Sequence, residues 1–114
     1  MTFKDNKAIY LQIAELMMDE ILQGKYAEED RIPSVREYAG TVEVNVNTCM
    51  RAYDWLCAQE IIFTKRGLGY FVCKGAKKCI LKEKKAEFFD EFIPELIQRM
   101  TTLGIDRQEI IDRL

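Results

Sequence analysis

The sequence predicts a mainly α-helical fold with one small β-hairpin. Three observations between Arg31 and Val72 predict it: a capping pattern before a short helix, a second capped helix after a turn, and two β-rich runs joined by glycines. That order of elements is the outline of a winged helix-turn-helix. Apolar residues beyond Gly75 predict a C-terminal helical extension.

Length and composition limit the class of protein. With 114 residues, 48% of them hydrophobic and 32% charged, the chain fits one globular domain or a small domain plus an extension. No apolar run approaches the roughly 20 residues of a membrane span. The start, MTFKDNKAIY, has no apolar stretch of the secretory type. We therefore expect a cytoplasmic protein without a membrane partner.

The cysteine and histidine content bears on chemistry. The four cysteines form no C-x-x-C pair, and the chain has no histidine. This pattern favours buried, reduced thiols over a metal site, and no cofactor is expected. The alternatives are a metal site or a redox switch, for which Cys49 is the candidate. Histidine is the commonest general base, so an enzyme is not expected.

The charge is unevenly distributed. The formal net charge is −2, yet the segment from Lys65 to Lys85 contains eight basic residues and a single acid, Glu83. A local basic patch on an acidic chain can still hold phosphates.

The first predicted helix runs from Ile9 to Gly24, with apolar residues at helical spacing. An acidic loop, Lys25 to Arg31, follows it. Ser34 and Glu37 then form a capping box, in which each side chain satisfies a free backbone N–H at the start of a short helix.

The next helix is capped by Asn45 and extends to about Gln59. Its predicted core-facing residues are Val46, Cys49, Met50, Tyr53, Leu56 and Cys57. Its opposite face carries Asn47, Thr48 and Arg51. An amide, a hydroxyl and a guanidinium are groups that contact base edges and phosphates, although a merely solvated face would look the same.

Two β-rich runs, Ile61 to Lys65 and Tyr70 to Lys74, flank a glycine-containing connection. Glycine permits the positive φ angles that a tight hairpin needs. The result is a small wing with Lys65 and Arg66 near its tip.

The tail predicts an amphipathic helix from about Ile80 to Leu103, with a kink or a break just before Pro94. A last short helix is capped by Asp106 and Glu109. The tail has more apolar surface than a short appendage can bury on itself, which favours a second copy of the chain as its partner over packing back onto the first helix. The predicted dimerisation residues are Phe88, Phe89, Phe92, Leu96, Met100 and Leu103.

These residues resemble the GntR family of bacterial transcription regulators, and within it the short YtrA-like subfamily. The resemblance runs from Ala8 to Val72 and includes the tail. Its most specific motifs are Ile32-Pro33-Ser34-Val35-Arg36-Glu37, Val44-Asn45-Val46-Asn47-Thr48, Arg51-Ala52-Tyr53 and Arg66-Gly67-Leu68-Gly69-Tyr70-Phe71-Val72. The sequence departs from the usual subfamily pattern at three positions, where Tyr38 replaces leucine, Glu43 replaces glycine and Val46 replaces proline.

The resemblance implies a homodimer that binds a palindromic operator in double-stranded DNA, with the third helix in the major groove and the wing in or beside the minor groove. The implied domains are residues 1–76, the winged helix-turn-helix DNA-binding domain, and residues 77–114, the helical dimerisation extension. The implied DNA-binding residues are Arg36, Asn45, Asn47, Thr48, Arg51, Lys65, Arg66 and Gly67.

The predicted function is that of a sequence-specific transcriptional regulator, most simply a dimeric repressor of a transporter operon or of neighbouring genes. The alternative is a winged-helix module that binds protein and not DNA. A small-molecule effector would sit where the winged domain meets the tail, near Gly75. The operator sequence, the regulated genes and the effector do not follow from the sequence.

Overall fold

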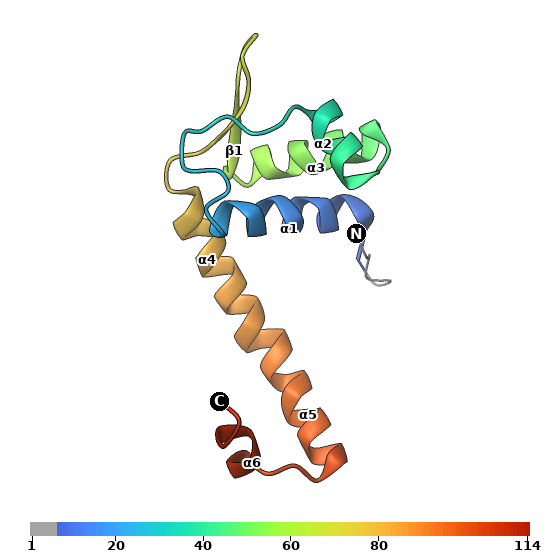
Figure 1. Cartoon of the computed structure of the whole chain (residues 1–114), viewed down its shortest axis with the longest axis vertical. Coiled ribbons are helices and arrows are strands. Elements are labelled where there is room, and N and C mark those ends of the chain that lie inside the picture. The colour runs from blue at the N-terminus through green and yellow to red at the C-terminus, as the bar shows by residue number, and fades with distance from the viewer. Residues whose placement is uncertain (1–6) are drawn as a thin grey trace. The chain divides into compact units, whose positions relative to one another are not determined.

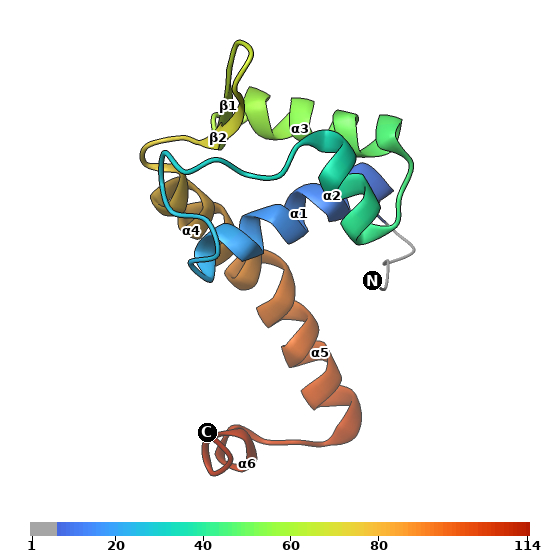
Figure 2. The same ribbon diagram turned by 45° about the horizontal axis from the view of Figure 1, so that its top comes forward.

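The computed structural model describes residues 7–114, which divide into two compact units, the first ending at Leu81 and the second comprising residues 82–114. The first unit contains, in order, α1 (Ile9–Leu22), α2 (Val35–Val42), α3 (Val46–Ala58), β1 (Ile62–Lys65), β2 (Gly69–Val72) and the start of α4 (Ala76–Glu87), as Figures 1 and 2 show. The mainly helical fold with one small hairpin is therefore confirmed.

The core of the first unit lies where α1 and α2 pack against α3. Its largest fully buried side chains include Tyr38, Tyr53, Ile13, Met17 and Leu56. The two tyrosine hydroxyls are satisfied, because Tyr38 donates to Glu20 and Tyr53 donates to the carbonyl oxygen of Pro33 at 2.7 Å. Burial is the main cause that raises the pKa of both phenols, so they remain neutral donors.

Both predicted helix caps of the helix-turn-helix are confirmed. The Glu37 amide donates to the Ser34 hydroxyl and the Ser34 amide donates to the Glu37 carboxylate, each at 3.1 Å. The Asn45 side chain accepts from the Asn47 amide at 2.8 Å. The turn between these helices contains Glu43 at φ +57°, a left-handed conformation that a side chain disfavours.

The hairpin is antiparallel, with Ile62 opposite Val72 and Lys65 opposite Gly69. The outer edge of β2 is covered by the loop after α1, since the Ile32 amide donates to the Tyr70 carbonyl at 3.0 Å. Gly69 has φ +111°, a conformation that strains any side chain, and a Cβ there would also lie 3.2 Å from Arg31 Nε. The second strand ends at Val72, two residues before the predicted end, because the chain turns after Cys73 to start α4.

The predicted core face of α3 is partly wrong. Val46 and Met50 were expected inside, but they are 37% and 40% exposed, whereas Ala52 is fully buried. The buried residues of α3 are Cys49, Ala52, Tyr53 and Leu56, so the core face is rotated by about 50° toward Ala52 at 3.6 residues per turn. The small side chain of Ala52 lets α3 pack against its neighbours on that side.

The second unit contains the remainder of α4, the π-helical turn η1 (Phe88–Phe92), α5 (Ile93–Leu103) and α6 (Arg107–Ile111). The predicted interruption before Pro94 takes the form of this π-helical turn. Proline has no N–H to donate, and a wider turn before it accommodates its ring. The helix starts earlier than expected, at Ala76, because Ala76 and Ile80 are buried in the first unit.

In the second unit, η1, α5 and α6 contain no buried residue. The capping box of Asp106 and Glu109 is confirmed, with the Glu109 amide donating to Asp106 at 3.0 Å. Between residues 7 and 114, no helix combines the length and the apolar character that crossing a membrane requires. The predicted domain division after residue 76 stays a prediction.

The cysteines only partly match the expectation of buried thiols. All four are free; Cys49 is buried, Cys57 and Cys73 are half-buried, and Cys79 is exposed on the first turns of α4. Burial raises the pKa of Cys49 to about 11, which agrees with core packing and disfavours a redox role there. Among the described residues, no group of three or more cysteine, aspartate or glutamate side chains is arranged to hold a metal ion.

Candidate nucleic-acid interface

The exposed face of α3 is the first part of the candidate interface. In the first three turns of the helix, its solvent-facing residues are Val46, Asn47, Met50, Arg51 and Asp54. Asn47 and Arg51 lie where the sequence places them, whereas Thr48 is half-buried at the margin of this face. The face therefore combines one amide, one guanidinium and one carboxylate with two apolar side chains.

Arg51 is held in place by α1. Its guanidinium carbon lies 4.1 Å from the centroid of the Tyr10 ring, within the range of a cation–π contact. An exposed contact of this kind contributes about 0.5–1 kcal/mol, whereas a bidentate base contact contributes about 1–3 kcal/mol. Tyr10 can therefore orient Arg51 in the free protein without preventing it from reaching DNA.

Met50 is oriented by the wing. The hydroxyl of Tyr70 in β2 lies 3.8 Å from Met50 Sδ. The Tyr70 ring in turn packs edge-on against the buried Tyr53 ring, with centroids 4.9 Å apart. This chain of contacts connects the core, the wing and the exposed face of α3.

The start of α2 supplies the second part. Arg36 is exposed in the first turn of this helix, where free backbone N–H groups also favour anions. The hydrogen bonds from Ser34 are the main cause that lowers the pKa of Glu37, so this capping carboxylate is ionised at neutral pH beside Arg36.

The wing is the third part. Lys65 Nζ lies 4.5 Å from the Phe71 ring centroid, and Phe71 stacks on Phe63 with centroids 5.8 Å apart. This packing holds the ammonium group on the hairpin. The turn closes through a hydrogen bond from the Leu68 amide to the Lys65 carbonyl at 2.9 Å, with Gly67 at φ +77°. Arg66, Gly67 and Leu68 are exposed at the tip.

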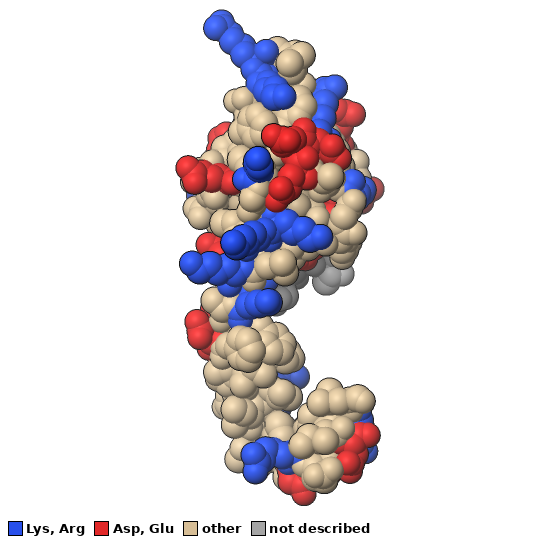
Figure 3. Space-filling model, turned by 90° about the vertical axis from the view of Figure 1, so that its left-hand side faces the viewer, with Lys and Arg blue, Asp and Glu red and all other residues tan. Residues whose placement is uncertain are grey.

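The charge on one face alternates in sign. Figure 3 shows basic side chains at the wing and again near the start of α4, with acidic side chains between them. Part of the acidic loop after α1 is structural, because Glu28 accepts from the Gly75 amide at 2.9 Å and Asp30 accepts from the Ala27 amide at 3.1 Å. Phosphate affinity would therefore depend on local cations and not on a uniform basic surface.

The second unit presents an apolar stripe and, beside it on α5, a mostly polar face. Phe88, Phe89 and Phe92 are 45%, 65% and 52% exposed, and the rings of Phe88 and Phe92 stack with centroids 5.2 Å apart. On α5 the predicted residues Leu96, Met100 and Leu103 continue this side at helical spacing.

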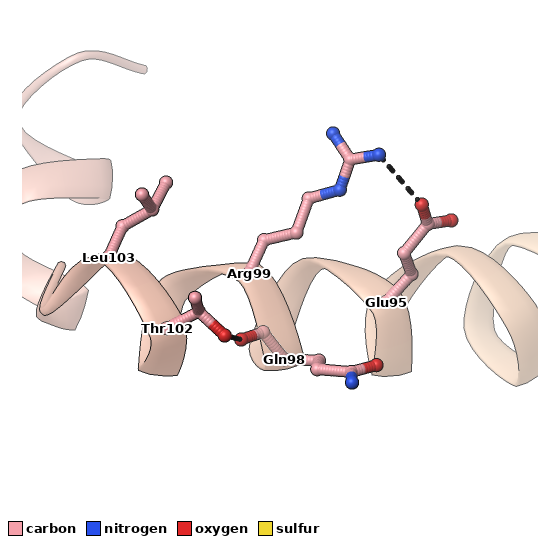
Figure 4. Close-up of a pocket in the computed structure, with 5 residues that line it drawn as sticks. All are labelled: Glu95, Gln98, Arg99, Thr102 and Leu103. Atoms are coloured by element: carbon pink, nitrogen blue, oxygen red, sulfur yellow. Dashed lines mark hydrogen bonds and ion pairs between the residues drawn. The ribbon is translucent and has the colours of Figure 1, made fainter.

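A neighbouring face of α5 carries an open hollow of about 370 Å³, lined by Glu95, Gln98, Arg99, Thr102 and Leu103. Figure 4 shows its lining, in which Arg99 reaches along the helix to Glu95 at 3.0 Å and the Thr102 hydroxyl donates to the Gln98 carbonyl. Apart from Leu103, which also belongs to the apolar stripe, the lining is polar, so Gln98 and Arg99 offer positions for control variants.

The sequence-predicted DNA-binding residues thus lie on three elements: Arg36 on α2, Asn45, Asn47, Thr48 and Arg51 at or in α3, and Lys65, Arg66 and Gly67 on the wing. Sequence reasoning missed Met50 and Asp54 on the exposed face and Tyr10 beneath Arg51. The apolar character of Met50 gave no signal of its exposure, and the contact between Tyr10 and Arg51 joins residues that are distant in the sequence.

Three comparisons connect this geometry to known proteins. The family model "Bacterial regulatory proteins, gntR family" matches residues 9–72, more than half of the chain. The HTH-type transcriptional regulator YhcF of Bacillus subtilis is 33% identical over 96% of this chain and 89% of its own length. The HTH-type transcriptional repressor YtrA of the same organism is 32% identical over 94% of this chain and 82% of its own length.

A solved structure gives the same result. The putative GntR-family transcriptional regulator of Bacteroides thetaiotaomicron is 50% identical, with a TM-score of 0.72 over 92% of this chain and 91% of its own length. The relatives of the present chain are regulators with a helix-turn-helix and not enzymes. The chain belongs to the GntR family of bacterial transcriptional regulators and resembles its short YtrA-like members.

Proposed function

We propose that this chain is a homodimeric repressor that binds a palindromic operator, each protomer contacting one half-site. The observation that carries the proposal is the exposed face of α3, which displays Asn47, Met50 and Arg51; Arg36 at the start of α2 and the basic wing tip are exposed as well. The chain's membership of a family of DNA-binding regulators supports it. Repression, and not activation, is supported by the similarity to YtrA, which is described as a repressor.

We assign the contacts by chemistry. Arg51 and Asn47 offer bidentate hydrogen bonds to guanine and adenine, respectively, in the major groove. Met50 and Val46 offer apolar contact to thymine methyl groups, and Asp54 can accept from cytosine N4. Arg36, Lys65 and Arg66 would contact phosphates, with Asn45 and Thr48 at the margins of α3 and Gly67 allowing the wing to approach the backbone.

The exposed apolar stripe of the second unit supports dimerisation. Exposed aromatic clusters are unusual on a monomer surface and mark contact sites. Because a twofold dimer reads two half-sites about one helical turn, or a multiple, apart, the interface of Phe88, Phe89, Phe92, Leu96, Met100 and Leu103 would set the half-site spacing. A transporter operon or neighbouring genes are the proposed targets, on the basis of the subfamily likeness, and the small-molecule effector stays a prediction.

The test is a footprint of the purified chain on the promoter upstream of its own gene. We expect protection of two symmetric half-sites. Arg51→Ala should weaken operator binding by about 1–3 kcal/mol, which is about 5- to 150-fold. The matched control is Arg99→Ala, an exposed arginine of α5 that pairs with Glu95; it should leave operator affinity unchanged.

Two outcomes would contradict the proposal. Unchanged operator protection by Arg51→Ala would show that the exposed face of α3 is not the reading face. A chain that shifts no fragment of its genome at moderate salt would support the alternative, a winged-helix module that binds protein.

A further inference from the structure

Three of the four cysteines meet at one hollow in the first unit. Cys57 comes from the last turn of α3, Cys73 follows β2, and Cys79 lies on α4; all three line an open depression of about 520 Å³. The rest of the lining includes Ile62 and Phe63 of β1. Because Cys57 is 16 residues from Cys73 and 22 from Cys79, no short spacing motif predicts that the three line one hollow.

Cys57 and Cys73 belong to one hydrogen-bonded junction. The Glu60 amide donates to the Cys57 carbonyl at 3.0 Å, and the Cys73 amide donates to the Ile61 carbonyl at 2.9 Å. The turn that ends α3 is thereby bound directly to the strand that leaves the wing. Cys79 lines the same hollow but lies outside this junction, on the exposed side of α4.

The chemistry of the hollow favours thiol exchange over metal binding. Among residues 7–114, these sulfurs and the neighbouring carboxylates are not arranged to hold a metal ion. Burial is the main cause that raises the pKa of both Cys57 and Cys73, and the nearby Cys73 thiol adds to the effect on Cys57. Both thiols are therefore mostly protonated at neutral pH, and their exchange should become faster as the pH rises.

We propose that this hollow is a redox modification site, in which a small-molecule disulfide oxidises Cys57 and Cys73 to a disulfide that links α3 to the exit of the wing. The link regulates operator binding, and this part of the proposal rests on the proposed DNA-binding function.

The reaction takes two exchanges. First, the Cys73 thiolate attacks one sulfur of the small disulfide; that S–S bond breaks, a mixed disulfide forms on Cys73, and one small thiolate leaves and takes up a proton. Second, the Cys57 thiolate attacks the Cys73 sulfur, the mixed disulfide breaks, and the second small thiolate leaves and is protonated. Two protein thiols are oxidised and one small disulfide is reduced to two thiols.

The link has a structural consequence. A disulfide fixes its two sulfurs about 2.05 Å apart with a narrow range of dihedral angles, and the free thiols of Cys57 and Cys73 have no such constraint. Closing the bond therefore constrains the last turn of α3 relative to the strand after the wing. Since the α3 face and the wing contact one operator together, a change in their relative placement should lower operator affinity, by about tenfold in our expectation.

The test exposes the full chain to oxidised glutathione and measures its intact mass and its cysteine-linked peptides without reductant. We expect the loss of two hydrogens and one crosslinked peptide pair that contains Cys57 and Cys73. Cys79→Ser should form the same link, and Cys57→Ser should stop at a glutathione adduct on Cys73. A link that contains Cys79, or adducts without any link, would overturn the proposal.

Operator binding is then measured before oxidation, after oxidation and after dithiothreitol. An affinity that falls and recovers in the parent chain and in Cys79→Ser, but not in Cys57→Ser, supports the regulatory role; an unchanged affinity refutes it. The mass measurement requires no DNA. A reduced chain that binds no operator would therefore contradict the proposed function while leaving the disulfide chemistry to be judged by itself.

Discussion

The two units of the chain use apolar residues in opposite ways. In the first unit Leu56, Tyr53 and Ile13 are fully buried, whereas in the second unit Leu103 is 70% exposed and Phe89 is 65% exposed. Both sets follow the same helical spacing in the sequence. The difference teaches that periodicity identifies an apolar face, while the presence of neighbouring elements decides whether that face becomes a core or a contact surface.

The largest expected effect is on the free energy of unfolding, and it should differ between a buried and an exposed leucine. Leu56→Ala should lower the free energy of unfolding by about 2–5 kcal/mol, because it leaves a cavity between packed helices. Leu103→Ala should change it by less than about 0.5 kcal/mol, since an exposed side chain loses little on truncation. Urea unfolding measures both, at a protein concentration low enough to keep the chain monomeric. Equal losses would show that the second unit has a core of its own.

The second effect tests whether a copy of the chain covers the exposed stripe. Phe92→Asp should weaken self-association by at least about 2 kcal/mol, roughly 30-fold in the dissociation constant, because it places a charge in an aromatic contact. Gln98→Asp, on the polar side of α5, adds the same charge and should have little effect. Sedimentation equilibrium measures both constants. A monomeric parent chain, or equal effects of both variants, would contradict the dimer interface.

The same contrast explains what the sequence could predict. The caps at Ser34, Asn45 and Asp106 are local, because each depends on residues within one turn, and all three are confirmed. The order of elements and the wing followed from equally local signals. The basic character of the wing tip and the exposure of Asn47 and Arg51 were also predictable from the sequence.

The errors arose where a neighbour decides the outcome. Met50 is apolar but exposed, since α3 turns its Ala52 side to the core and Tyr70 contacts the Met50 sulfur. The contact between Arg51 and Tyr10 joins two helices that are distant in the sequence. The shared hollow of Cys57 and Cys73 likewise depends on the hairpin and α4 meeting the end of α3. Single-sequence periodicity contains none of this information.

The third effect compares the two capping boxes. Ser34→Ala should lower the global unfolding free energy by about 0.5–2 kcal/mol, because α2 is packed in the core of the first unit. Asp106→Ala removes the same local hydrogen bond from α6, which packs little, and should only fray that helix. Thermal unfolding measures the first effect and amide exchange the second. An equal fall in melting temperature would show that α6 unfolds together with the first unit.

The capping box also gives a pH dependence with a defined sign. The folded-state pKa of Glu37 lies below its ordinary value of 4.5, so its contribution to stability is present above that value and is lost as the pH falls through the lower folded value. Glu37→Gln removes the titrating carboxylate and should remove this part of the acid destabilisation, whereas Ser34→Ala keeps the backbone amide that is the main cause of the lowered pKa. Unfolding curves of the parent and Glu37→Gln should therefore converge at acidic pH; curves that stay parallel would contradict the assignment.

The smallest expected effect on stability comes from the residue that follows the last turn of a helix in each unit. Both α2 and α5 are followed by a residue in the left-handed region, Glu43 at φ +57° and Gly104 at φ +68°. A side chain costs about 1–2 kcal/mol in that conformation, partly offset by the greater freedom of glycine in the unfolded chain. Glu43→Gly should therefore stabilise the first unit by about 0.5–1 kcal/mol in chemical unfolding. Glu43→Ala removes the same charge but keeps a Cβ, so it should bring no gain; equal stabilisation by both variants would identify charge, and not backbone conformation, as the cause.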